Sequence, residues 1–237
     1  MTKACRWLVV MALAALSLSC HRDEIYGSGL WVEEPYHVIG GYKSVRVRDG
    51  LRLVVDPTLS SQMVVVRSDE ELVGSVSVKV FRDELSVGYK NPFTFQTQLV
   101  TEVYIPDDAT IVEYNLRDSE MVSTRRLERD SLDIVCDHSK VTLAMNADYV
   151  NLKAEDGSQV MLEGGVGMCS LNLDGSMVDA GMLFCDSVLL QMSASRLNIY
   201  SRSWVYGALI NGSELRLDGM GVAKVDLSHD STMKRTR

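Results

Sequence analysis

The chain has 237 residues, of which 46% are hydrophobic, 24% charged and 7% aromatic. These values are typical of a globular protein of one or two domains, and they argue against disorder, collagen and a multi-span membrane protein. Lysine and arginine number 24 against 32 aspartates and glutamates, which gives a formal net charge of −8. A basic surface that would track phosphates is therefore not expected, and nucleic acid is not a predicted partner.

Residues 1–19 have the organisation of a secretory signal peptide. Lys3 and Arg6 form a positive start, and an apolar stretch follows at 7–18. That stretch is shorter than the ~20 helical residues needed to cross a bilayer. A cleavable signal peptide over 1–19 is the better interpretation, and it indicates an exported protein.

Cys20 follows small residues in a sequence that resembles a bacterial lipobox. We therefore expect lipid attachment at Cys20, with the membrane as a partner through that lipid; secretion with cleavage after Ser19 is the alternative. The stretch at 21–24 resembles the acidic signals that direct some Bacteroidota lipoproteins to the cell surface. The predicted location is the outer membrane, exposed at the cell surface, with a periplasm-facing orientation as the alternative. Residues 20–35 are expected to form a lipid-proximal tether.

An internal repeat of 18 to 20 residues is the most informative feature of the chain, because such periods are typical of stacked architectures. It is marked by serines at Ser119, Ser139, Ser158, Ser176, Ser195, Ser213 and Ser231. Two residues after each serine stands an apolar residue, at Met121, Val141, Val160, Val178, Leu197, Leu215 and Met233. Apolar residues two apart indicate strands.

A second pair of apolar residues recurs earlier in each unit. The pairs are Leu132 with Ile134, Val150 with Leu152, Leu171 with Leu173, and Val188 with Leu190. Turn sequences such as Asp174-Gly175-Ser176 separate the pairs, and glycine supplies the positive φ that a sharp corner needs. We predict an all-β fold in which 111–237 form a single-stranded parallel β-helix, or β-solenoid, with Val141, Val160 and Val178 in one column. An up-and-down β-barrel is the alternative.

The region 36–110 has strand-like alternation but lacks the serine pattern. Apolar residues share one parity from Val45 to Val55, and further strands are indicated around Val78, Leu85 and Val103. We expect this β-rich region to cap the N-terminal end of the solenoid and to cover its first strand edges.

Three cysteines lie beyond the first twenty residues, each within apolar or strand-like sequence: Cys136, Cys169 and Cys185. One coil of 18 residues would place Cys169 over Ser187, with Cys185 two residues short of that position. An offset of ~6.6 Å along a strand plus one coil spacing exceeds the ~7 Å reach of a disulfide. We predict no disulfide and expect the thiols to be buried as small hydrophobic groups.

Several segments together resemble a known family. They are Ile39-Gly40-Gly41-Tyr42 with Val45-Arg46-Val47, the strand Leu51 to Val55, Glu84-Leu85-Ser86-Val87, and Val103-Tyr104-Ile105-Pro106, which leads into the serine-marked coils. The chain from about residue 36 onwards is similar to the putative auto-transporter adhesin "head GIN" domain family, common among Bacteroidota lipoproteins. This resemblance implies a right-handed parallel β-helix with a surface or adhesive role and no established enzymatic activity.

No catalytic constellation emerges from the sequence. Carboxylates stand two residues before three of the serines, at Asp137, Asp156 and Asp174, and on stacked coils they would repel one another or share a cation. We expect each to cap its own turn. The side chains of Asp137, His138 and Ser139 cannot form a triad as neighbours in sequence. No histidine has a partner at metal-ligand spacing, so neither a metal nor another cofactor is predicted.

Aromatic residues give the best candidate for a binding site. Tyr200, Trp204 and Tyr206 lie within seven residues of one another, and such rings can stack against a sugar or anchor a protein partner. The alternative is that they shield the side of the solenoid. The predicted function is that of a non-enzymatic, lipid-anchored surface protein whose β-helix presents a face to a protein or glycan. An envelope structural or accessory lipoprotein is the second hypothesis. A carbohydrate-active β-helix enzyme, which would need converging carboxylates on one face, is the third.

Overall fold

The structure is a computed structural model that describes residues 24–91 and 94–236. The predicted signal peptide at 1–19 and the predicted lipid site at Cys20 lie outside the described residues and stay predictions. Within the described ranges, no helix is both long enough and apolar enough to cross a membrane.

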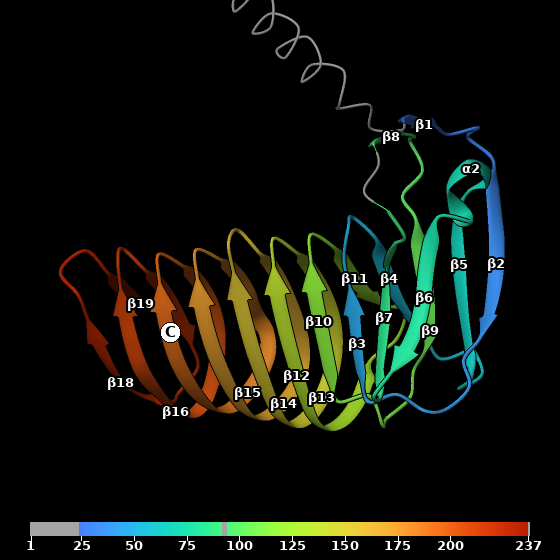
Figure 1. Cartoon of the computed structure of the whole chain (residues 1–237). Coiled ribbons are helices and arrows are strands. Elements are labelled where there is room, and N and C mark those ends of the chain that lie inside the picture. Colours follow the sequence, from blue (N-terminus) through green and yellow to red (C-terminus); the bar gives the residue numbers. More distant parts are fainter. Residues whose placement is uncertain (1–23, 92–93, 237) are drawn as a thin grey trace, which may run out of the picture.

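Parallel strands wound into stacked coils make up most of the molecule (Figure 1). The fold is a β-solenoid of about 7 turns. Its later coils consist of β10 (Glu113–Arg117), β11 (Glu120–Ser123), β12 (Leu127–Asp137), β13 (Lys140–Glu155), β14 (Gln159–Asp174), β15 (Met177–Ser193), β16 (Arg196–Ile210), β17 (Glu214–Asp218), β18 (Val222–Leu227) and β19 (Thr232–Thr236). All their pairings with one another are parallel, which confirms the solenoid and excludes the up-and-down barrel.

The predicted column of apolar residues is confirmed. Val141, Val160 and Val178 are direct ladder partners on successive coils, and all three are buried. The same column continues in both directions through Val103, Leu53, Met121, Val141, Val160, Val178, Leu197, Leu215 and Met233. From Met121 onwards the stacked side chains are 18 to 20 positions apart, because each coil supplies an inward residue at the same point of its path, and Leu53 and Val103 join the same column from farther away in the sequence.

The marker serines form a second column, at the corner that precedes each apolar residue. They are buried, and most use Oγ twice: the oxygen accepts a hydrogen bond from the backbone N–H of the serine one coil earlier and donates to a carbonyl of its own corner. The N–H to Oγ bonds join Ser119 to Ser139, Ser139 to Ser158, Ser176 to Ser195, Ser195 to Ser213 and Ser213 to Ser231. We call this column the serine ladder. It explains the serine repeat, since a short hydroxyl satisfies buried backbone groups at a corner where no strand pairing is available.

The corners before the serine ladder differ in length. Ser139 donates from Oγ to the carbonyl of Asp137, two residues earlier, whereas Ser158 donates to the carbonyl of Glu155, three residues earlier. In the strand ladder Asp137 accordingly pairs with Glu155. The prediction that Asp137 and Asp156 occupy equivalent stacked positions is therefore wrong, because the extra residue moves Asp156 into the corner.

The first coils lie upstream of residue 111, where a separate cap was predicted. Strands of this region pair in parallel with the later coils or with one another: β3 (Ser44–Val47), β4 (Arg52–Asp56), β7 (Glu84–Tyr89) and β9 (Glu102–Pro106). The serine pattern is absent here, but the apolar alternation is the same. The solenoid therefore begins near residue 44, and the predicted division between 36–110 and 111–237 does not mark its start.

A smaller set of elements covers the N-terminal end of the stack (Figure 1), and we call it the cap. The members that pack on the first coils are β2 (Trp31–His37), β5 (Met63–Asp69), α2 (Glu70–Val73) and β6 (Val76–Phe81). The strands among them pair in antiparallel fashion. Beside them, β1 (Glu24–Tyr26) pairs with β8 (Thr94–Gln96). The predicted tether at 20–35 is shorter than expected, because β2 begins at Trp31 and alternates between exposed and partly buried residues against β5.

The geometric argument against a disulfide is also wrong. Cys169 is the ladder partner of Val188, not of Ser187, and Cys185 is the partner of Val166. The Sγ atoms of the two cysteines are 2.9 Å apart, and both remain thiols in this structure. The sequence argument measured the offset along a straight strand, whereas the chain turns a corner between Val166 and Cys169. Inward side chains on the two sides of a corner converge.

Candidate functional site

One side of the solenoid presents a flat parallel sheet, which we call the lateral face. It consists of the outward side chains of 149–155, 168–174, 187–193, 204–210 and 222–227. Inward residues of these strands belong to the buried core. Because side chains alternate along a strand and strands pair in register, the outward residues form straight columns across the coils.

Two columns of the lateral face carry most of its polar groups. The first runs through Asn151, Ser170, Leu189, Tyr206 and Lys224, and the second through Lys153, Asn172, Gln191, Ala208 and Asp226. A shallow, open depression of about 750 Å³ lies between them. Amide, hydroxyl, aromatic and charged groups therefore converge on one rigid surface.

Tyr206 and Trp204 form an aromatic pair on this face. Their ring centroids are 5.5 Å apart at an interplanar angle of 78°, an edge-to-face contact. The Tyr206 side chain is 47% exposed, and the Lys224 ammonium lies 5.7 Å from its ring centroid. Tyr206 therefore offers an open ring face or edge to a ligand while its neighbours hold it in place.

Tyr200, the third aromatic of the predicted site, belongs to a different cluster. Its ring contacts Phe184 at a centroid distance of 5.2 Å, and Phe184 is its ladder partner on the previous coil. A corner separates Tyr200 from Trp204, where the buried Oγ of Ser201 donates to the carbonyl oxygens of Trp204 and Asp186. The sequence prediction grouped the three rings by distance along the chain, and the corner divides them.

Sequence reasoning missed the amides of the lateral face. Asn172 and Gln191 are ladder partners one coil apart, and Tyr206 lies in the adjacent column. The available signal was the alternation itself: Asn172 lies between the inward Leu171 and Leu173, and Gln191 between the inward Leu190 and Met192, so both amides must point outward. Placing the amides next to one another also required the correct register. The residues equivalent to Val150 and Leu152 on the next coil are Cys169 and Leu171. By itself, the sequence pattern indicates Leu171 with Leu173 instead.

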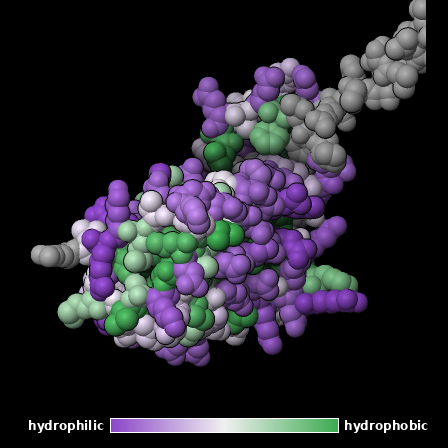
Figure 2. Space-filling view, turned by 90° about the vertical axis from the view of Figure 1, so that its left-hand side faces the viewer, coloured by the Kyte–Doolittle hydropathy of each residue, from purple (hydrophilic) through white to green (hydrophobic). Residues whose placement is uncertain are grey.

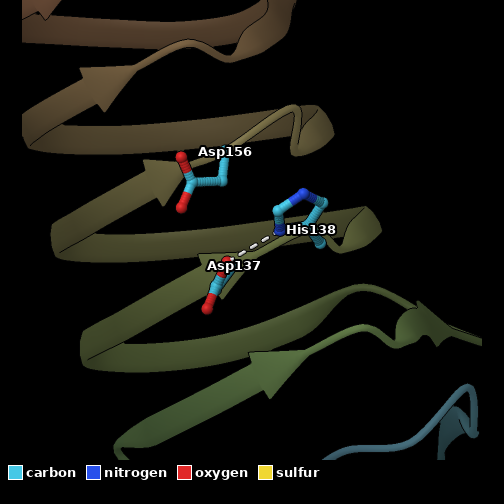
Figure 3. A group of neighbouring side chains, drawn as sticks. All are labelled: Asp137, His138 and Asp156. Atoms are coloured by element: carbon cyan, nitrogen blue, oxygen red, sulfur yellow. Dashed lines mark hydrogen bonds and ion pairs between the residues drawn. The ribbon is translucent and has the colours of Figure 1, made fainter. Parts of the chain in front are cut away.

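Asp137, His138 and Asp156 gather at the corners of two successive coils (Figure 3). One ligand atom from each residue lies within 4.8 Å of the others, and His138 Nδ1 is 3.1 Å from Asp137 Oδ1. Asp137 is also paired with Arg117, at 3.4 Å from Nε to Oδ2. The three side chains are partly or fully exposed, and Arg117 already supplies a cation to Asp137. The cluster therefore resembles a solvated corner network more than a metal centre.

A second depression, of about 380 Å³, lies beside the first corner of the middle coils and is acidic. Its charged lining residues are the carboxylates Glu128, Asp148 and Asp186 and the guanidinium groups of Arg129 and Arg202. Arg202 Nη1 lies 3.4 Å from Asp186 Oδ1, and the amide of Asn146 donates to Glu128 at 2.9 Å. Two of the three carboxylates thus have partners within the protein.

The C-terminal end of the stack is open. Figure 2 looks onto this end and shows hydrophobic residues gathered on it. Met220, Val222, Leu227 and Met233 are all exposed large hydrophobic residues of the last coils. The cap covers the opposite end, so the two ends of the solenoid present very different surfaces (Figure 1).

The fold places this protein in the class of parallel β-solenoids, with one capped end and an amide-rich lateral face. The sequence agrees with that class: residues 41–227 match the model of the family described as "Putative auto-transporter adhesin, head GIN domain". The chain belongs to this family, as its resemblance at Ile39 to Val47 predicts. The family is not a known enzyme family. No curated protein sequence matches the chain.

Solved structures share the fold. A putative adhesin from Bacteroides fragilis superposes with a TM-score of 0.76 at 14% identity, over 90% of this chain and 100% of the other. A putative lipid binding protein from Parabacteroides distasonis gives 0.69 at 10% identity, over 91% and 100%. A putative adhesin from the same species gives 0.63 at 12% identity, over 90% and 100%. At such low identity the likeness establishes the fold alone.

Proposed function

We propose that this protein is a non-enzymatic, lipid-anchored adhesin of the cell surface and that its lateral face binds a glycan. The observation that supports this most strongly is the exposed ring of Tyr206 beside the amides of Asn172 and Gln191 on a rigid sheet. Membership of an adhesin family agrees with a binding role.

The chemistry of the lateral face fits a carbohydrate. An aromatic ring stacks on the apolar face of a sugar, and amides both donate to and accept from hydroxyl groups. The depression is shallow and open, so it suits an extended chain better than an enclosed small molecule. Because the groups lie on a sheet packed over a solid core, little conformational entropy is lost when they bind.

The position of the chain start fits a membrane anchor at the capped end. The described chain begins with β1, beside the cap and away from β18 and β19 (Figure 1). Lipid on Cys20 would tie the capped end to the outer membrane and leave the later coils and the lateral face pointing outward. In cells, Cys20→Ser should release the protein from the membrane fraction. Protease added to intact cells should cut the lipidated protein if it faces the surface, and should spare it if it faces the periplasm.

A glycan array followed by affinity measurement tests the binding role. Tyr206→Ala should weaken binding to the best-bound glycan at least about tenfold, since a central aromatic contact contributes ~1.4 kcal/mol or more. Gln191→Ala should weaken it less. The matched control is Phe81→Ala, which removes a ring that is 70% exposed but lies in the cap.

Two outcomes would contradict the proposal. The first is an array that gives no glycan ligand for the wild-type protein. The second is a glycan whose affinity is unchanged by Tyr206→Ala, or falls equally with Phe81→Ala. If a protein rather than a glycan bound in a way that depends on Tyr206, the adhesive role would stand and the ligand would be a protein.

The acidic depression favours one other function, that of a carbohydrate-active enzyme. Such enzymes use two carboxylates placed about the scissile bond, and Glu128, Asp148 and Asp186 line a single depression. By contrast, Asp226 is the sole carboxylate among the described residues that line the lateral depression. Turnover of a polysaccharide by the wild-type protein, abolished by Asp148→Asn, would establish the enzyme in place of the adhesin.

A further inference from the structure

Two buried cysteines face each other across the interior of the solenoid. Cys169 in β14 and Cys185 in β15 are both fully buried, and their Sγ atoms are 2.9 Å apart. This separation is within about 1 Å of the ~2.05 Å length of a disulfide bond. The third core cysteine, Cys136, is equally buried but has no such neighbour among the hydrogen bonds of the described residues.

The local path of the chain explains why the two thiols meet. Val166 pairs with Cys185 before a corner, and Met168 pairs with Ser187 after it. Gly167 occupies the corner, where a Cβ would lie 2.8 Å from the carbonyl oxygen of Asp148 on the neighbouring coil. Cys169 is the inward residue after the corner on one coil, and Cys185 is the inward residue before the corner on the next coil. The tight turn brings these two side chains together.

We propose that Cys169 and Cys185 form a disulfide that links two adjacent coils through the core of the solenoid. In this step two thiols lose two protons and two electrons, which pass to the disulfide of an envelope dithiol–disulfide oxidoreductase or of a small-molecule disulfide. One cysteine thiolate attacks that disulfide and forms a mixed disulfide. The second cysteine then displaces the carrier thiol and closes the intramolecular bond, so that one disulfide is made and one is reduced.

Burial determines when the bond can form. The hydrogen bond to Cys185 and burial raise the pKa of the Cys169 thiol far above its usual value, and a thiol rather than a thiolate is a poor nucleophile. Oxidation therefore takes place before β15 packs on β14. Once the coils have closed, reductants and alkylating agents reach the pair only after unfolding. Oxidation also requires a compartment outside the reducing cytoplasm, and here the proposal rests on the export proposed above.

Peptide mapping of the full chain tests the bond directly. Protein isolated from the cell envelope is unfolded without reductant, its free thiols are alkylated, and the digest is examined by mass spectrometry. We expect the peptides with Cys169 and Cys185 to be joined and Cys136 to be alkylated. The same chain refolded from the reduced state with oxidised glutathione should give the same map, independently of export.

The two preparations separate the possible failures. Alkylation of both Cys169 and Cys185 in both preparations would overturn the proposal. A bond in the refolded protein with free thiols in the envelope protein would overturn the native disulfide and would argue against an oxidising location, leaving the glycan-binding proposal to its own test.

Thermal unfolding supplies a second readout. The bond closes a short loop, so reduction after unfolding and refolding should lower the Tm of the wild-type protein by roughly 6–12 °C. Cys136→Ala should retain this dependence on redox state, because it removes an equally buried thiol that is outside the pair. The double variant Cys169→Ala with Cys185→Ala should show none. Equal Tm values for the oxidised and reduced wild-type protein would contradict a bond that stabilises the stack.

Discussion

The serine-marked coils and the N-terminal part of the molecule are stabilised by different kinds of contact. Between residues 119 and 218 the apolar column recurs on each coil and the serine ladder on most of them, with a break at Ser158, whose N–H donates to the carbonyl of Glu155. The apolar column also runs through Leu53 and Val103 of the first coils, but the cap and the junction between the first and the later coils add polar contacts that occur only once. Arg129 reaches across to Asp107 at 2.6 Å, and the buried carboxylate of Asp69 accepts from the N–H groups of Ser28 and Gly29. The repeated contacts can therefore be read from the period of the sequence, whereas the contacts that occur once depend on individual residues.

The largest expected effect is a charge placed in the middle of the apolar column. Val160 is 3% exposed and stacked between Val141 and Val178. Val160→Asp should lower the free energy of unfolding by at least about 4 kcal/mol, because an unpaired carboxylate would be buried. Chemical denaturation followed by circular dichroism measures the change.

Val222→Asp is the matched control at the open end, where the side chain is 71% exposed. It should change the free energy of unfolding by no more than ~0.5 kcal/mol. Equal destabilisation by the two substitutions would mean that the interior column does not carry the stability of the stack.

The next largest effect belongs to a contact that occurs only once, the ion pair between Arg129 in β12 and Asp107, which directly follows β9. The Arg129 side chain is 2% exposed and bonds Asp107. Arg129→Ala should cost about 3 kcal/mol in the free energy of unfolding, because it removes a buried side chain and leaves Asp107, whose side chain is 18% exposed, without its partner. Arg52→Ala is the comparison: Arg52 pairs with Glu102 and Glu120 near the surface, and its loss should cost about 0.5–1 kcal/mol. Similar costs for both variants would show that the Arg129 pair is effectively solvated.

The corners before the marker serines offer a test with a smaller expected effect, in which one substitution removes a Cβ and the other adds one. Gly175 and Ala194 stand immediately before their marker serines, and both have left-handed backbone, at φ 61° and φ 47°. Ala194→Gly should raise the free energy of unfolding by about 1 kcal/mol, because a Cβ is strained in this conformation. Gly175→Ala should lower it by a similar amount, since an added Cβ would meet no atom closer than 4.0 Å and only the backbone conformation is at issue. Denaturant midpoints that moved in the same direction for both variants would contradict this assignment.

The smallest effect is local and depends on pH. Burial favours the neutral form of Asp69, but the N–H groups of Gly29, Ser28 and Glu71 and the Thr97 hydroxyl favour the charged form, and the pKa falls from 3.8 to about 2. A carboxyl whose pKa is lowered by folding stabilises the fold above pH ~4, and that stabilisation is lost as the pH falls from about 4 to 2. Hydrogen exchange at Ser28 and Gly29 should therefore accelerate in this window before exchange along the serine ladder does.

Asp69→Asn provides the control for the pH effect. It should give fast exchange at Ser28 and Gly29 at neutral pH and remove the dependence below pH 4. Unchanged exchange in the variant would show that other contacts hold this segment.

The sequence was sufficient for the coils because each position is repeated. Seven serines and the apolar residues after them establish the period, and the column through Val141, Val160 and Val178 follows from it. The cap was less accessible, since contacts such as those of Asp69 with Ser28 and Gly29 occur once and join residues that no period relates. The start of the solenoid near Ser44 was missed because the first coils lack the serine ladder.

The candidate site, too, could be predicted from the sequence only in part. Tyr206 and Trp204 were found from their clustering, but the register that sets Asn172 and Gln191 near them shifts at irregularities within the coils, between Met161 and Glu163 and again between Ala180 and Ser187. The corner between Val166 and Cys169 likewise concealed the approach of Cys169 to Cys185. Periodicity gives the direction of a side chain, and corners decide which side chains meet.

Nuclear magnetic resonance of the protein with its best-bound oligosaccharide tests the proposed binding face most directly. The account predicts that the largest chemical-shift changes occur on the lateral face, at Asn172, Gln191 and Tyr206. Largest changes at Val222 and the open end, or at Phe81 in the cap, would contradict it.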